Sequence, residues 1–157
     1  MQSVLDLCQG LPQRTYEAGD ILIAEGTKTD ALHVLVSGEV EIVKGEVPIY
    51  ATTEPGSVFG EISVLLDIPH TATVRVVRPS RAYFVEGACD FLRAHRDLAY
   101  LLSRVLARRL NGVTSYLADL KAQYQDRRDH LGMVDEVLES LMHQQDELDP
   151  GSDRSPA

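Results

Sequence analysis

The stretch that decides the fold runs from Gly56 to Val74 and reads GSVFGEISVLLDIPHTATV. It predicts a glycine turn, a short apolar helix, a proline turn and then a strand. Gly60 has no Cβ, so a ligand can approach the backbone closely there, and the amides that open the following helix suit an anion. Glu61 can accept hydrogen bonds from ligand hydroxyls, and Thr71 offers a hydroxyl nearby if the proline turn folds back. An anion beside vicinal hydroxyls is typical of a nucleotide.

Composition limits the classes of protein to consider. The chain has 157 residues, 44% of them hydrophobic, which is enough for one compact domain with an appendage. The net charge of −9 argues against a nucleic-acid surface, which needs a basic face. No apolar run is long enough to span a bilayer, and residues 1–6 do not resemble a signal peptide. Cys8 and Cys89 are too few for a disulfide framework, so we expect a cytoplasmic protein without a membrane partner.

The segment 16–85 is rich in short β-forming runs that are separated by glycine turns. Such spacing indicates a sandwich or barrel. Within it, apolar residues alternate with period two on either side of Gly38, as a half-buried hairpin requires. The alternating residues are Val34, Val36, Val40 and Ile42.

The Gly56–Val74 stretch closely resembles the phosphate-binding cassette of the cyclic nucleotide-binding domain family. The segments 18–21, 25–26 and 36–40 resemble the β-roll of the same family, and they occur in the expected order. The resemblance covers roughly residues 10 to 115. It implies an α+β fold, a β-roll or double-stranded jelly roll with flanking short helices, followed by a long C-terminal helix.

The resemblance also implies a set of ligand contacts. Glu61 would bind the ribose 2'-hydroxyl, although it could instead be a surface residue that caps its own helix. Gly60 and Ile62 would offer backbone amides to the phosphate. Thr71 and Ala72 would contact the phosphate from the opposite side, unless Thr71 is an ordinary strand residue. Thr114 would reach the purine from the long helix, with a plain helix-surface role as the competing interpretation.

His70 departs from the family pattern, in which an arginine at this position pairs with the cyclic phosphate. His70 could replace that arginine as a pH-dependent phosphate ligand, because imidazole titrates near pH ~6.5. It could also mark a pocket retuned for a nucleoside or an uncharged metabolite, or a turn residue in a pocket that no longer binds. A basic residue from elsewhere could compensate, the candidates being Lys44, Arg75 and Arg78.

The segment 97–145 carries apolar residues in alternating steps of four and three, which is the coiled-coil signal. We therefore predict one long dimerisation helix after a β-roll domain at 1–96, with bends or breaks at Gly112 and Gly132. The segment 146–157 is polar and predicts a disordered tail. The apolar stripe consists of Leu106, Leu110, Val113, Leu117, Leu120, Tyr124, Leu131, Val134, Leu138 and Leu141.

The leading functional hypothesis is a ligand-sensing regulatory module. It would bind a cyclic purine nucleotide, most plausibly cyclic AMP, and signal through its C-terminal helix to an unidentified protein partner. The alternative is a constitutive dimeric scaffold with a degenerate or retuned pocket. The five histidines are scattered and no catalytic triad or Walker pattern is evident, so we expect no metal, no cofactor and no enzymatic activity. No helix-turn-helix is expected after the long helix, so direct DNA binding is not predicted.

Overall fold

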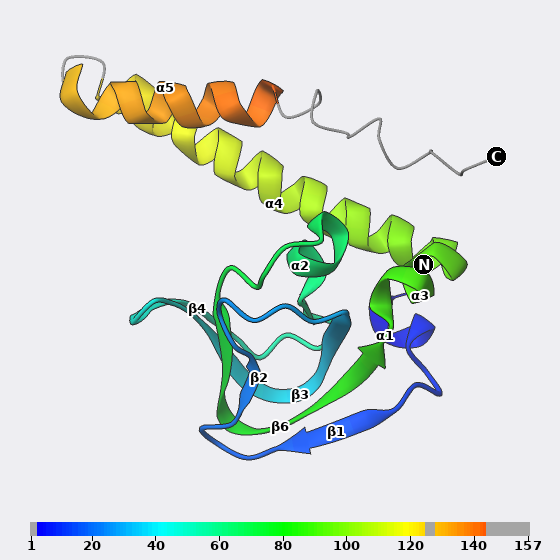
Figure 1. The fold of residues 1–157 in the computed structure, drawn as a ribbon. Helices are drawn as coiled ribbons and strands as arrows, with labels where there is room; N and C mark the ends of the chain where they lie inside the picture. The colour runs from blue at the N-terminus through cyan, green and yellow to red at the C-terminus, as the bar shows by residue number, and fades with distance from the viewer. Residues whose placement is uncertain (1–2, 125–127, 144–157) are drawn as a thin grey trace. The chain divides into compact units, whose positions relative to one another are not determined.

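The computed structural model describes residues 3–124 and 128–143. The chain divides into two compact units, Met1–Arg104 and Val105–Ala157, and the first contains the sheet. In chain order (Figure 1) the elements are α1 (Val4–Leu7), β1 (Gln13–Tyr16), β2 (Ile21–Ile23), β3 (Ala31–Lys44), β4 (Val47–Thr52), β5 (Val58–Phe59), α2 (Glu61–Leu66), β6 (Thr73–Glu86), α3 (Ala88–Ala94), α4 (Arg96–Gln123) and α5 (Arg128–His143).

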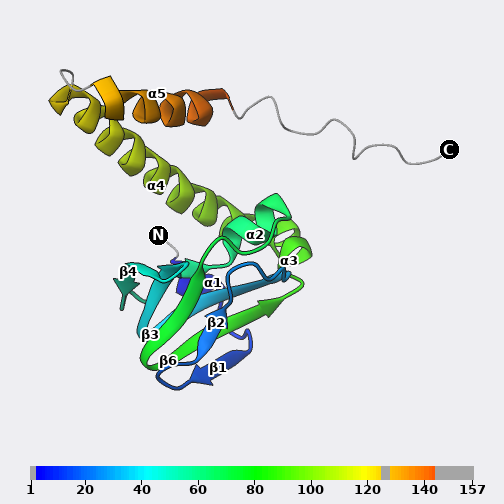
Figure 2. The ribbon, with the colours of Figure 1, turned by 60° about the vertical axis from the view of Figure 1, so that its left-hand side comes forward.

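The sheet is antiparallel throughout its described pairings and is built on two long strands, β3 and β6. Its order is β1-β6-β3-β4, with β2 also pairing with β6 and β5 also pairing with β3. The β3–β6 ladder extends from Ala31 opposite Glu86 to Val43 opposite Thr73. The two long strands curl around the interior of the domain, with β1 and β2 lying beside β6 (Figure 2). This arrangement confirms the predicted β-roll.

The bend in β3 depends on Gly38, where the register with β6 shifts. Its φ is +103°, and a Cβ built there would lie 2.6 Å from the carbonyl oxygen of Pro79. The position therefore requires glycine on both conformational and steric grounds. Next to it, the hydroxyl of Ser80 accepts a hydrogen bond from the Glu39 amide at 3.1 Å. This bond gives the Glu39 N–H a partner where the register of the ladder shifts.

The interior of the roll is filled by apolar side chains from β2, β3, β5 and β6. Before Gly38 the strand β3 is buried at every residue from Ala31 to Leu35, and α2 and α3 both contact this strand. A strand that is covered on both faces carries buried residues at consecutive positions. The period-two alternation of a half-buried strand therefore does not hold from Ala31 to Leu35. The interior cluster comprises Ile23, Leu35, Val40, Phe59, Val74 and Val76.

The start of α4 belongs to the first compact unit, which ends at Arg104 rather than at the predicted boundary of 96. Leu98 and Leu102 are 4% and 3% exposed, so one face of the first two turns of the helix is buried within this unit. The sequence placed the boundary where the strand pattern stops. The first unit continues past that point, because buried side chains at the start of α4 still pack within it.

The predicted single helix over 97–145 is described as two helices, since α4 ends at Gln123 and α5 begins at Arg128. Gly112 lies within α4 and Gly132 within α5, and neither breaks its helix. The expectation of a break at either glycine is therefore wrong, and the expectation of a bend stays a prediction. A helical glycine costs only about 1 kcal/mol relative to alanine, which neighbouring turns can absorb. The predicted disordered tail over 146–157 lies outside the described residues.

The second unit consists of the rest of α4 together with α5 (Figures 1 and 2). The ammonium of Lys121 and the carboxylate of Asp135 form an ion pair between the two helices. On α4, Leu110 and Val113 of the apolar stripe remain 48% and 51% exposed. Within the described residues, no helix combines the length and apolar character that a membrane span needs.

Candidate functional site

The site begins at Gly60, which joins β5 to α2. Gly60 has φ +93° and is the N-cap of α2, where its carbonyl accepts from the Val64 amide at 3.1 Å. A Cβ at this position would lie 2.7 Å from the carbonyl oxygen of Ala31 on β3. Only glycine fits such a close approach of two backbone segments, so the sheet and α2 are held in contact at this residue.

Glu61 is the first residue of α2 and is 5% exposed, while the Ile62 side chain beside it is 41% exposed. A carboxylate so deeply buried is tolerated only where hydrogen-bond donors surround it. The interpretation of Glu61 as a surface capping residue is therefore wrong. The exposed Ile62 side chain leaves its backbone amide as the group that could serve a ligand.

His70 lies inside the same site, 6% exposed, and does not occupy a solvated turn. Its Cε1 atom would lie 3.6 Å from a Cβ at Gly60, and its Nε2 atom is 2.7 Å from the hydroxyl oxygen of Thr29. The His70 amide donates to the Thr27 carbonyl and the His70 carbonyl accepts from the Gly26 amide, both at 2.8 Å. Burial lowers the pKa of His70 below its ordinary value, so its neutral form is favoured.

The residues after His70 lie at the edge of the site. Thr71 is exposed and Ala72 is half-buried. The Lys44 ammonium donates to the Thr71 carbonyl at 2.6 Å and lies 3.9 Å from the Glu25 carboxylate. Lys44 thus brings a cationic group from the end of β3 to the cassette, although it is far from it in sequence.

The two arginines considered as substitutes for the missing arginine are engaged elsewhere. Arg75 forms an ion pair with Glu41, and Arg78 forms one with Glu39, both between β6 and β3. Their guanidinium groups pair with the glutamates that lie opposite them in the β3–β6 ladder, and no contact with the cassette is seen in the described residues. Of the three basic candidates, Lys44 alone contacts a cassette residue in the described part of the chain.

A buried polar pair lies next to the site on the interior of the roll. His33 is 5% exposed and pairs across the sheet with Phe59, the residue before Gly60. Its Nδ1 atom and the Tyr16 hydroxyl are buried without a hydrogen-bond partner in the described structure. Burial, together with the charges of Arg14 and His70, lowers the pKa of His33 to about 4.

The structure therefore groups Gly60, Glu61 and His70 in one place, with their chain neighbours Ile62, Thr71 and Ala72 around them. Thr114 lies in α4 beyond Arg104, in the second compact unit, and its role at the purine stays a prediction. Sequence reasoning missed Thr29, since nothing in the spacing connects it to His70. Within the described residues, no group of three metal-ligating side chains comes together.

The model of the cyclic nucleotide-binding domain family matches residues 13–93, which include both the roll and the cassette. The chain belongs to the cyclic nucleotide-binding domain family.

Individual relatives are similar over parts of their length. The cAMP-dependent protein kinase regulatory subunit of Yarrowia lipolytica is 41% identical over 69 residues, covering 43% of this chain and 18% of that protein. The CRP-like cAMP-activated global transcriptional regulator of Mycobacterium tuberculosis is 29% identical over 126 residues, covering 75% of this chain and 55% of that protein. The structure of the catabolite activator protein of Thermus thermophilus superposes with a TM-score of 0.64 and 25% identity, covering 75% of this chain and 59% of that one.

Proposed function

We propose that this protein is a sensor of a cyclic purine nucleotide, most plausibly cyclic AMP, and that it acts as a regulatory module. The ribose would bind at Glu61, and the cyclic phosphate would bind against the backbone of Gly60 and Ile62, with Thr71 and Ala72 on the other side. The relatives named as cAMP-dependent or cAMP-activated support the choice of ligand.

The observation that carries the proposal is the buried carboxylate of Glu61 next to the constrained Gly60. Glu61 is 5% exposed at the start of α2, where a backbone carbonyl approaches Gly60 so closely that a Cβ is excluded. Burying a carboxylate costs free energy, which hydrogen-bond donors around it must offset, so the surroundings of Glu61 suit a group that accepts hydrogen bonds. A ribose hydroxyl is a donor of the kind that such a carboxylate selects.

The charge that neutralises the phosphate is assigned to Lys44. The neutral form of His70 is favoured by burial and is already hydrogen-bonded to Thr29, so it lacks the permanent charge of an arginine. The Lys44 ammonium donates to the Thr71 carbonyl at 2.6 Å, so it lies at the cassette even though it is also 3.9 Å from the Glu25 carboxylate. His70 would contribute as a hydrogen-bond partner, and as a cation only under mildly acidic conditions.

A second candidate ligand is a nucleoside or another uncharged metabolite. The burial of His70 favours an uncharged ligand of this kind. A pocket without a guanidinium would bind a phosphate group less tightly, because it lacks the paired charge-assisted hydrogen bonds. Such a pocket would keep the ribose contact of Glu61 and use the His70–Thr29 pair as a neutral donor and acceptor.

Calorimetry with cyclic AMP, cyclic GMP, AMP and adenosine tests the proposal and separates these ligands. Cyclic AMP should bind most tightly, and Glu61→Ala should weaken it roughly ten- to hundred-fold while the domain stays folded. Glu54→Ala removes the same charge from an exposed position and is the matched control. Preferential binding of adenosine would favour the retuned pocket, and no binding of any ligand would favour a scaffold with a degenerate pocket.

Occupancy of the site would be passed on through the C-terminal helices, on which we propose that the protein forms a homodimer. The exposed Leu110 and Val113 on α4 support this role, since apolar side chains at these positions favour burial against a second copy. A ligand would shift the output only through a different affinity for two arrangements of the molecule.

Light scattering of a Leu110→Glu, Val113→Glu double variant tests the dimer. The unsubstituted protein should have a dimer mass at micromolar concentration, and the variant should have a monomer mass. Ser115→Glu adds charge on the other side of the same helix turn and should leave the dimer intact. A monomer mass for the unsubstituted protein would contradict this part of the proposal.

A further inference from the structure

A cavity of about 460 Å³ lies between α2, α3 and the first turn of α4, all within the first compact unit. Its volume is within the range of small-molecule sites in proteins. None of the residues assigned to the nucleotide lines it, so it is a separate space. Its apolar walls are formed by Val64, Leu65, Leu92 and Ala99.

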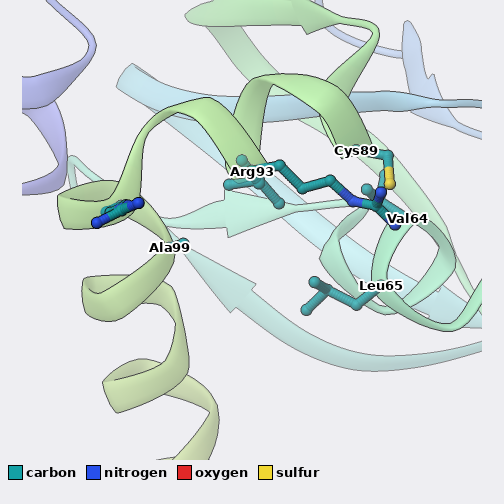
Figure 3. Close-up of a pocket in the computed structure, with 7 residues that line it drawn as sticks. Val64, Leu65, Cys89, Arg93 and Ala99 are labelled. Atoms are coloured by element: carbon teal, nitrogen blue, oxygen red, sulfur yellow. The ribbon is translucent and has the colours of Figure 1, made fainter.

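The polar part of the lining consists of Arg93, Arg96 and the thiol of Cys89. Figure 3 shows the Arg93 side chain extending from α3 toward Val64 of α2, across the space that Leu65 and Cys89 also border. Both arginines are exposed residues of a chain whose net charge is −9. Within the described residues, neither guanidinium forms an ion pair, whereas Arg75 and Arg78 on the sheet are each paired with a glutamate.

This combination selects a particular class of ligand. A guanidinium group binds a carboxylate or phosphate group well, because its fork of donors matches two oxygens of the anion. The aliphatic walls favour an apolar body of a few carbons, whose burial is driven by the hydrophobic effect. A purely polar anion would leave the walls in contact with water, and a purely apolar molecule would leave the guanidinium groups unused.

We propose that this cavity binds a small amphipathic anion, with an acidic head group at Arg93, a further positive charge from Arg96 at the rim, and a short aliphatic chain between α2 and α3. Octanoate is the probe that represents this chemistry. The site is independent of the nucleotide site proposed above, so each can be present without the other.

Cys89 provides a direct readout, because it lines the cavity and is partly accessible. The other cysteine, Cys8, is completely buried, and burial raises the pKa of its thiol to about 11, so it reacts slowly at pH 8. Octanoate should therefore slow the alkylation of Cys89 in a saturable way, followed by mass spectrometry on the full chain. Octanol and octylammonium, which lack the anionic head group, should protect at least about ten-fold less well.

The head-group contact is tested by an Arg93→Gln, Arg96→Gln double variant. It should bind octanoate roughly ten-fold more weakly or worse, while weak protection by octanol stays unchanged. Arg108→Gln, at an exposed position further along α4, should behave like the unsubstituted protein. Octyl phosphate, compared with octanoate, distinguishes a phosphate from a carboxylate head group.

Three results would overturn the proposal. The first is no protection of Cys89 by octanoate at millimolar concentration, and the second is equal protection by octanol. The third is protection that rises with protein concentration in the absence of any ligand, which would show that a second copy of the chain fills the cavity. The comparison of octanoate with octanol uses the unsubstituted protein, so it decides the matter even if the double variant does not fold.

Discussion

The Nε2 atom of His70 lies 2.7 Å from the hydroxyl oxygen of Thr29, across 41 positions in the sequence. This hydrogen bond fixes a buried imidazole, whose neutral form is favoured by burial, at the position where the resemblance to the cassette implies an arginine. The choice between a charged and an uncharged ligand therefore depends on which basic side chain lies near the phosphate position.

Replacing His70 with arginine should tighten the binding of cyclic AMP at neutral pH by roughly ten-fold, the scale of one charge-assisted contact. In the unsubstituted protein, burial lowers the pKa of His70, so any contribution of its charge grows as the pH falls below ~6.5. Affinity should then rise toward acidic pH, by at most about ten-fold per pH unit for one coupled proton. Calorimetry at pH 5.5 and 7.5 measures both effects, and the arginine variant should have lost the pH dependence. Equal affinity of the unsubstituted protein for cyclic AMP at both pH values would show that protonation of His70 adds nothing to binding.

Lys44→Met should weaken cyclic AMP binding roughly ten-fold and leave adenosine binding unchanged, since only the phosphate uses the ammonium. The affinity of the unsubstituted protein for cyclic AMP should also fall with added salt more than that of the variant. Arg78→Met, which removes a cation already paired with Glu39, is the control and should bind normally. If both variants bind cyclic AMP equally well, the assignment of Lys44 is wrong.

Gly60→Ala should destabilise the domain more than Gly56→Ala does. The two glycines have nearly the same φ, +93° and +90°, so each substitution pays the conformational strain of about 1–2 kcal/mol. At Gly60 the new Cβ would also lie 2.7 Å from the Ala31 carbonyl oxygen, whereas at Gly56 the nearest atom is 3.7 Å away. Urea denaturation of the two variants isolates the steric part as their difference in unfolding free energy. Equal destabilisation would mean that α2 can move away from β3 at little cost.

Acid should destabilise the domain through His33 before its carboxylates are protonated. The folded-state pKa of His33 is about 4, below the ordinary 6.5, so the unfolded chain takes up the proton first as the pH falls. The stability tied to neutral His33 is complete above pH 6.5 and is lost between pH 6.5 and 4. Between pH 7 and 5 the loss amounts to about 2 kcal/mol.

His33→Phe should remove most of this loss, because phenylalanine keeps the contacts with the neighbouring rings without a titrating nitrogen. His95→Gln changes an exposed histidine and serves as the control. The measurement is urea denaturation at pH 7 and pH 5. If the phenylalanine variant loses as much stability as the unsubstituted protein, His33 is not the responsible group.

The sequence by itself determined the β-roll and the location of the cassette. Both depend on local chemistry: glycines at the turns, apolar residues with a strand period, and the order of Gly60, Glu61 and Thr71 along one short stretch. Such signals act between neighbours in the chain, so they can be read without knowing which distant segments meet. The burial of Glu61 followed from the apolar residues on both sides of it.

Only the tertiary structure decided which groups surround that cassette. Thr29 reaches His70 and Lys44 reaches the Thr71 carbonyl across 41 and 27 positions in the sequence. The β3–β6 register places Glu41 opposite Arg75 and removes that arginine from consideration. Packing likewise set the end of the first unit at Arg104 and kept α4 helical through Gly112. These contacts depend on strand register and on the closeness of segments far apart in the chain, and residue spacing carries no record of either.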